Sequence, residues 1–319
     1  MSLESVSGSS KGGGAMFRKL IILLMGIGLY MAWQYEMPNV SAPTSVQVQS
    51  EVANERVSDA PKFASQYAGH DWYLVDRGGN RGLELIDEDG AKKGFYQFET
   101  GSTYRSLVLN ETTRDQVEDI GFEDVTSYNK GLNRYLIPDD PAFSVFAIDG
   151  QYVTFFFDQH DDDLLKGILS VERRVEEASE GYYGDLSKEG TVANEQLMRI
   201  LMNWDREKFD LNALSDYEPL YPVVRAHSQN MAQNDFFSHT DPEGRDPFDR
   251  MDEAGLSYSI AGENLAMGQM SVFHAHWGLM NSKGHRENIL QPRFTHAAVG
   301  LAYNDESSPF YTINFITPR

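Results

Sequence analysis

Residues 261–290 constrain the fold of this 319-residue chain more than any other stretch. Residues 262–264 read Gly-Glu-Asn and residues 284–288 read Gly-His-Arg-Glu-Asn, and an apolar segment with helical spacing separates them. Each polar signature therefore lies at the edge of a hydrophobic run, where a packed core can hold it in place. The pattern predicts a helix near residues 272–280 with a fixed polar group on either side.

Three candidate site residues follow from this pattern: His239, Glu263 and His285. They lie on separate segments, at spacings of 24 and 22 residues, so only the fold can bring them together. Two imidazoles and a carboxylate are the groups that a metal site or an acid–base site requires. Asn264 and Ser282 lie beside them in the sequence and offer further hydrogen bonds to a ligand.

The composition excludes several classes of protein. The chain has no cysteine, which excludes a disulfide framework, a thiolate metal site and a lipid-modified cysteine. Its net charge of −21 argues against a nucleic-acid partner, because the phosphates would be repelled. The length is sufficient for two ordinary domains.

The N-terminal region predicts an attachment to a membrane. Residues 1–15 are rich in Ser and Gly, a composition that predicts a disordered leader or an artificial extension ahead of Met16. Residues 16–35 hold an apolar run that follows Arg18 and Lys19, with no basic residue after it until Arg56. This asymmetry predicts a single-pass signal anchor in the cell membrane with the C-terminal part outside, or a secreted protein if the segment is cleaved. The polar, proline-containing residues 36–66 predict an extracellular linker.

Residues 67–180 predict a β-rich domain. An Asp-Gly pair at residues 149–150 separates apolar runs at 143–148 and 152–158, which is typical of a β-hairpin. Further strands are expected at 72–75, 95–98, 106–109 and 167–171, and a capped helix at 113–120. The acidic residues 158–163 lack the ligand spacing of an EF-hand, so a solvated loop is favoured over a calcium site.

Residues 190–319 predict alternating helices and strands. Apolar spacing indicates helices at 193–209, 221–234, 251–256 and 272–280, and strands at 298–303 and 310–316. His227 lies on a semi-apolar helix face and is expected in the core. His274 and His276 are two residues apart on a helix, so they point to different faces and make a poor chelate.

From about residue 195 to the end, the chain resembles the bacterial branch of the CAP superfamily (cysteine-rich secretory proteins, antigen 5, pathogenesis-related proteins). The matching motifs occur in family order: Asn203-x-x-Arg206, His227-Ser228-x-x-Met231, Phe236-Phe237-Ser238-His239, Pro247-Phe248-x-Arg250, Gly262-Glu263-Asn264, Trp277-x-x-Met280-x-Ser282, Gly284-His285-Arg286-x-Asn288-Ile289-Leu290 and Phe310-Tyr311-Thr312-x-Asn314-Phe315. The resemblance implies an α+β protein whose C-terminal α-β-α sandwich follows a smaller, β-rich, CAP-associated domain and the N-terminal membrane anchor. Such an arrangement is found in envelope proteins of Gram-positive bacteria.

The resemblance also implies a site. In well-studied relatives a cleft carries two histidines and two glutamates, and some relatives bind a divalent metal there. His239, Glu263 and His285 match three of these four positions and are the expected ligands for a metal such as zinc. The fourth carboxylate is missing, because residues 277–282 of the preceding helix contain none.

Three functions are open. The first is a surface-anchored, non-enzymatic binding module for a small molecule, a lipid or a cell-envelope component, and the missing carboxylate favours it. The second is a metal-dependent hydrolase acting on peptide or cell-wall substrates. The third is an envelope scaffold or sensor in which residues 67–180 contact a partner.

Overall fold

The computed structural model describes residues 60–319, a mixed α and β arrangement as the sequence predicts. The expected leader, signal anchor and most of the expected linker lie outside these residues. Within the described part, no helix is both long enough and apolar enough to span a membrane.

The first half of the described chain forms an eight-stranded antiparallel sheet, in the order β1-β2-β3-β4-β12-β11-β10-β7. Its strands are β1 (Lys62–Ala64), β2 (His70–Asp76), β3 (Arg81–Asp87), β4 (Lys92–Gln97), β7 (Glu123–Asp124), β10 (Phe143–Ile148), β11 (Gln151–Asp158) and β12 (Leu164–Glu172). Two small hairpins and two short helices complete this half: β5 (Thr103–Tyr104) with β6 (Leu107–Val108), β8 (Ser127–Lys130) with β9 (Asn133–Leu136), α1 (Arg114–Glu118) and α2 (Arg173–Ala178). The sheet starts earlier than the sequence indicated, because β1 lies inside the range assigned to the linker.

Local chemistry explains the elements that the sequence predicted best. Asp149 and Gly150 both have positive φ, 51° and 77°, the conformation that a two-residue hairpin turn between β10 and β11 requires. Thr113 and Gln116 form the reciprocal capping box at the start of α1. In the acidic loop, Asp158 is buried and receives two hydrogen bonds from Arg286, at 3.1 and 2.9 Å.

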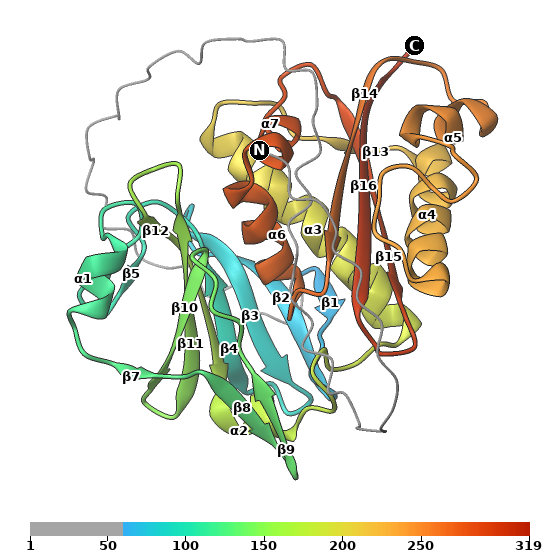
Figure 1. Cartoon of the computed structure of the whole chain (residues 1–319). Helices are drawn as coiled ribbons and strands as arrows, with labels where there is room; N and C mark the ends of the chain where they lie inside the picture. Colours follow the sequence, from blue (N-terminus) through green and yellow to red (C-terminus); the bar gives the residue numbers. More distant parts are fainter. Residues whose placement is uncertain (1–59) are drawn as a thin grey trace, which may run out of the picture. The chain divides into compact units, whose positions relative to one another are not determined.

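The second half is a three-layer sandwich around a four-stranded sheet in the order β13-β15-β16-β14. Helices α4 and α5 cover one face, and α3, α6 and α7 lie on the other side (Figure 1). The elements are α3 (Lys188–Lys208), β13 (Ser215–Asp216), the 3-10 turn Glu218–Leu220, α4 (Tyr221–Asn234), α5 (Pro247–Glu253), β14 (Tyr258–Met267), α6 (Val272–Asn281), α7 (Lys283–Ile289), β15 (His296–Tyr303) and β16 (Pro309–Pro318). Gly300 lets α4 approach β15 closely, since a Cβ there would lie 2.5 Å from a backbone atom of Val224.

Several boundaries differ from the expected ones for identifiable reasons. Helix α3 begins at Lys188, because the Ser187 side chain accepts a hydrogen bond from the backbone of Gly190. Helix α5 occupies Pro247–Glu253 where the sequence indicated 251–256, because Asp246 forms a capping box and Pro247 favours the first helical turn. Strand β14 was not expected, since the polar residues Glu263 and Asn264 interrupt its apolar pattern.

One hydrophobic core joins the two halves. The rings of Phe98 and Trp204 stack with centroids 3.9 Å apart, and Trp277 donates a hydrogen bond from Nε1 to the hydroxyl of Tyr96 at 3.0 Å. Helix α6 is buried on nearly every side, because it lies between the two sheets (Figure 1). Most of its residues are correspondingly apolar, and its two histidines are buried as well.

Candidate functional site

His239 is held in place by the segment that follows α4. Helix α4 ends at Asn234, and the next residue, Asp235, changes the direction of the chain through its left-handed conformation (φ 52°). His227, buried as expected, places Nε2 3.0 Å from the carbonyl oxygen of Ser238. Arg250 on α5 donates a hydrogen bond to the carbonyl oxygen of His239 at 2.8 Å. The backbone of His239 is thereby fixed, while half of its side chain stays exposed (49%).

Glu263 lies at the centre of the site, on β14. Its side chain is only 2% exposed, and both carboxylate oxygens are engaged. Oε1 lies 2.9 Å from Nδ1 of His239, and Oε2 accepts a hydrogen bond from Arg250 at 2.8 Å. Because the Arg250 side chain is itself 8% exposed, this is a buried ion pair. The sequence analysis missed the role of Arg250, although the residue closes one of the family motifs.

His285 completes the group from α7. Its Nδ1 lies 2.8 Å from the hydroxyl of Ser282. Burial, helped by the nearby imidazole of His239, lowers the pKa of His285 to about 4, so the ring is neutral at physiological pH. Asn264 donates to the carbonyl oxygen of His285 at 2.9 Å, and Asn288 donates to the side-chain oxygen of Asn264 at 2.9 Å.

The fold thus pairs His239 with Glu263, and His285 with Ser282 and Asn264. Asn288 links the two groups, because its side chain donates to the backbone carbonyl of Glu263 and to the side-chain oxygen of Asn264. We call His239, Glu263 and His285, with Arg250, the His–Glu site.

A divalent metal does not fit the His–Glu site in this arrangement. Each carboxylate oxygen of Glu263 already takes part in one close contact, and the Arg250 guanidinium at Oε2 would repel a metal cation. Across residues 60–319, no group of three or more His, Cys, Asp or Glu side chains has a metal-binding arrangement. The expected fourth ligand is also absent from the end of α6, where Asn281 instead donates to the carbonyl oxygen of Phe157 at 2.8 Å. The arrangement thus argues against zinc at the His–Glu site, where the resemblance implied it, and a titration tests this.

Other buried polar residues of this half support the fold. Arg206 is fully buried and donates hydrogen bonds to four carbonyl oxygens, those of Asn212, Ile289, Gln291 and Phe294. His276 lies 2.6 Å from Asp205 through Nε2, whereas His274 contacts Ser271. The two histidines face different neighbours, in agreement with the expectation that they do not chelate together.

These features define a class: an α-β-α sandwich that carries two histidines and a buried glutamate, the glutamate on a central-sheet strand. Residues 200–315 match the model of the cysteine-rich secretory protein family, CAP. The C-terminal part of the chain therefore carries a CAP domain, over residues 200–315.

Two curated relatives from Bacillus subtilis (strain 168) match this chain. One is the uncharacterized protein YkwD, 42% identical over 124 residues, which are 39% of this chain and 47% of YkwD. The other is the uncharacterized membrane protein YlbC, 32% identical over 145 residues, which are 42% of this chain and 40% of YlbC. The matched region spans about half the length of these relatives or less.

A solved structure shows that the likeness extends beyond the CAP domain. An extracellular protein containing an SCP domain from Bacillus anthracis str. Ames superimposes with a TM-score of 0.69 at 21% identity. The alignment covers 86% of this chain and 99% of that one, so both halves of the described structure share its fold.

Proposed function

We propose that this protein is a surface-anchored binding module of the cell envelope, and that its CAP domain binds a cell-envelope component without catalysis. The proposal rests on one observation: both carboxylate oxygens of Glu263 are in contact with other side chains of the protein. To act as a general base or as a metal ligand, Glu263 would have to give up one of its two present partners or share an oxygen with the substrate or ion. Both oxygens of Glu263 are already bound, one by Arg250 and one by His239.

The side chain that reaches outward is His239. Its Nδ1 is fixed by Glu263, and no group among residues 60–319 forms a hydrogen bond with its Nε2. His285 adds a second imidazole that remains neutral at physiological pH. Two oriented imidazoles without a free carboxylate suit hydrogen bonding to a polar ligand.

The location rests on separate support. Arg18 and Lys19 precede the apolar run of residues 20–33, which is the charge asymmetry of an outward-facing anchor. YlbC is described as a membrane protein and the Bacillus anthracis structure is that of an extracellular protein, and both agree with that location.

Co-sedimentation tests the proposal. Residues 50–319, one compact unit without the apolar run, are incubated with purified cell-wall sacculi in one arm and with lipid vesicles in another, and the pellets and supernatants are analysed. We expect the wild type to sediment with one of the two, and the variant carrying His239→Ala and His285→Ala to stay in solution. Release of soluble muropeptides would support the hydrolase alternative, and equal sedimentation of wild type and variant would exclude the His–Glu site as the binding site.

A further inference from the structure

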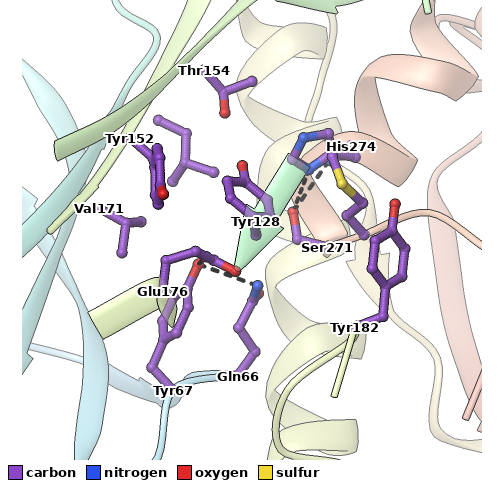
Figure 2. Close-up of a pocket in the computed structure, with 12 residues that line it drawn as sticks. Gln66, Tyr67, Tyr128, Tyr152, Thr154, Val171, Glu176, Tyr182, Ser271 and His274 are labelled. Carbon is purple, nitrogen blue, oxygen red and sulfur yellow. Dashed lines mark hydrogen bonds between the residues drawn. The ribbon is translucent and has the colours of Figure 1, made fainter. Parts of the chain in front are cut away.

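A second polar site lies at the junction of the two halves, where the eight-stranded sheet meets the start of α6. It is a small cavity of about 20 Å³, which is room for one oxygen-sized group. The residues that give it its character are four tyrosines, a glutamate and a histidine: Tyr67, Tyr128, Tyr152, Tyr182, Glu176 and His274 (Figure 2). We call it the tyrosine pocket. No residue of the His–Glu site lines it.

The charges around the tyrosine pocket cancel each other. Glu176 binds Lys130 through Oε1 at 2.7 Å and accepts the hydroxyl of Tyr67 on Oε2 at 2.6 Å. Lys130 also donates to the hydroxyl of Ser179 at 2.8 Å. Burial raises the pKa of Tyr67 and of Tyr128 well above the usual value, so both hydroxyls stay protonated. The pocket therefore offers no free charge to an ionic ligand.

His274, which lines the tyrosine pocket, has one ring nitrogen without a hydrogen-bond partner. The residue is 7% exposed, and its Nδ1 lies 2.8 Å from the hydroxyl of Ser271. Its Nε2 is buried and has no hydrogen-bond partner in the described part of the chain. Burial lowers the pKa of His274 to about 3, so this atom belongs to a neutral ring. Buried polar atoms in native proteins are rarely left unpaired, which indicates that something else bonds with Nε2.

The tyrosine pocket adjoins a much larger groove, since Gln66 and Tyr67 line both. The groove has a volume of about 1150 Å³ and runs beside the α2 segment. It carries charges of both signs, and its cations are already paired: Lys93 lies 3.6 Å from Glu172, and Arg174 donates to Glu172 at 2.8 Å. A groove of this size accommodates a ligand of several rings.

We propose that the tyrosine pocket and the adjoining groove bind an uncharged oligosaccharide, with one hydroxyl group in the pocket and the rest of the sugar chain in the groove. A hydroxyl both donates and accepts hydrogen bonds, so it matches Nε2 of His274, the hydroxyl of Thr154 and the tyrosine hydroxyls. Tyrosine rings provide apolar faces beside polar tips, as a sugar ring also does. Phosphates, carboxylates and the ends of peptides would each need a free counter-charge that this site lacks.

Calorimetric titration of the full chain tests this assignment. The probes are chitotetraose and maltotetraose, which differ in their sugar units, and a tetraglutamate peptide serves as the charged control. We expect one of the two sugars to bind with a stoichiometry of one. Tyr182→Phe should weaken that binding by about fivefold, the effect of losing one hydrogen bond, without altering the fold, because the Tyr182 hydroxyl has no hydrogen-bond partner in residues 60–319. His274→Gln should also weaken it.

The matched control is Tyr258→Phe, which removes a hydroxyl bonded to Asp252, away from the tyrosine pocket and the groove. Its affinity for the sugar should equal that of the wild type. Failure of the folded wild type to bind either sugar would overturn the proposal. Affinity that is unchanged in Tyr182→Phe and His274→Gln, or tighter binding of the peptide than of both sugars, would overturn it as well.

Discussion

Removing the carboxylate of Glu263 should destabilise the protein far more than removing a surface charge. The Glu263 and Arg250 side chains are 2% and 8% exposed, and their closest atoms lie 2.8 Å apart. The change Glu263→Ala leaves the Arg250 guanidinium buried without its counter-charge, which costs about 3–5 kcal/mol of the free energy of unfolding. The matched control is Lys62→Ala, since Lys62 and Asp71 are paired at 2.9 Å but are 61% and 34% exposed. That change should cost less than about 1 kcal/mol.

Urea denaturation followed by circular dichroism measures both changes, and a double-mutant cycle isolates the pair. Arg250→Met alone also removes hydrogen bonds to the carbonyl oxygens of His239 and Arg245, so it should be destabilising in its own right. The variant with both changes should lose less than the sum of the two single losses, because no charge is then left unpaired. If Glu263→Ala costs no more than Lys62→Ala, Glu263 is not held as a buried ion pair and the reasoning about the site fails.

Three further predictions concern packing, pH and calcium. Gly300→Ala should lower the free energy of unfolding by about 1–3 kcal/mol or more, since its Cβ would lie 2.5 Å from the α4 backbone. The control is Gly278→Ala in α6, where a Cβ meets nothing within 4 Å, so that change should be neutral or stabilising. Thermal melts compare the two variants. In the folded protein the pKa of His274 is about 3, against an ordinary 6.5, so the neutral ring contributes fully to the free energy of unfolding above pH 6.5, and this contribution is lost as the pH falls toward 3. By pH 5 the wild type should therefore lose about 2 kcal/mol that the His274→Gln variant does not lose. Equal slopes of stability against pH in the two proteins would refute this. Calcium should leave the Tm unchanged, since Asp158 in the acidic loop is already paired with Arg286, and a rise in Tm would show that the ion competes for it.

The sequence predicted the elements whose cause is local. The hairpin at Asp149 and Gly150 depends on two residues that tolerate positive φ, and α1 depends on a capping box within four residues. Helix α4 was located at its observed residues, because one face of its pattern is apolar. Such features need no knowledge of distant parts of the chain.

The parts that were missed depend on distant partners. Strand β14 buries Glu263 and Asn264, which is possible only because Arg250 from α5 and Asn288 from α7 form hydrogen bonds with them. Strand β3 was also missed, since the buried Glu84 at its centre is neutralised by Arg77 and Lys92 from neighbouring segments. The motifs indicated which residues form the site, but they did not indicate that the Glu263 carboxylate forms an ion pair with Arg250.

The central claim is that the His–Glu site binds its ligand through hydrogen bonds, while the carboxylate of Glu263 stays bound to Arg250 and His239. Calorimetric titration of the full chain with zinc near pH 7.5 tests it most directly. The account predicts no binding of zinc at sub-micromolar affinity in the wild type. One zinc ion bound with sub-micromolar affinity, and lost when His239 and His285 are both changed to alanine, would contradict it.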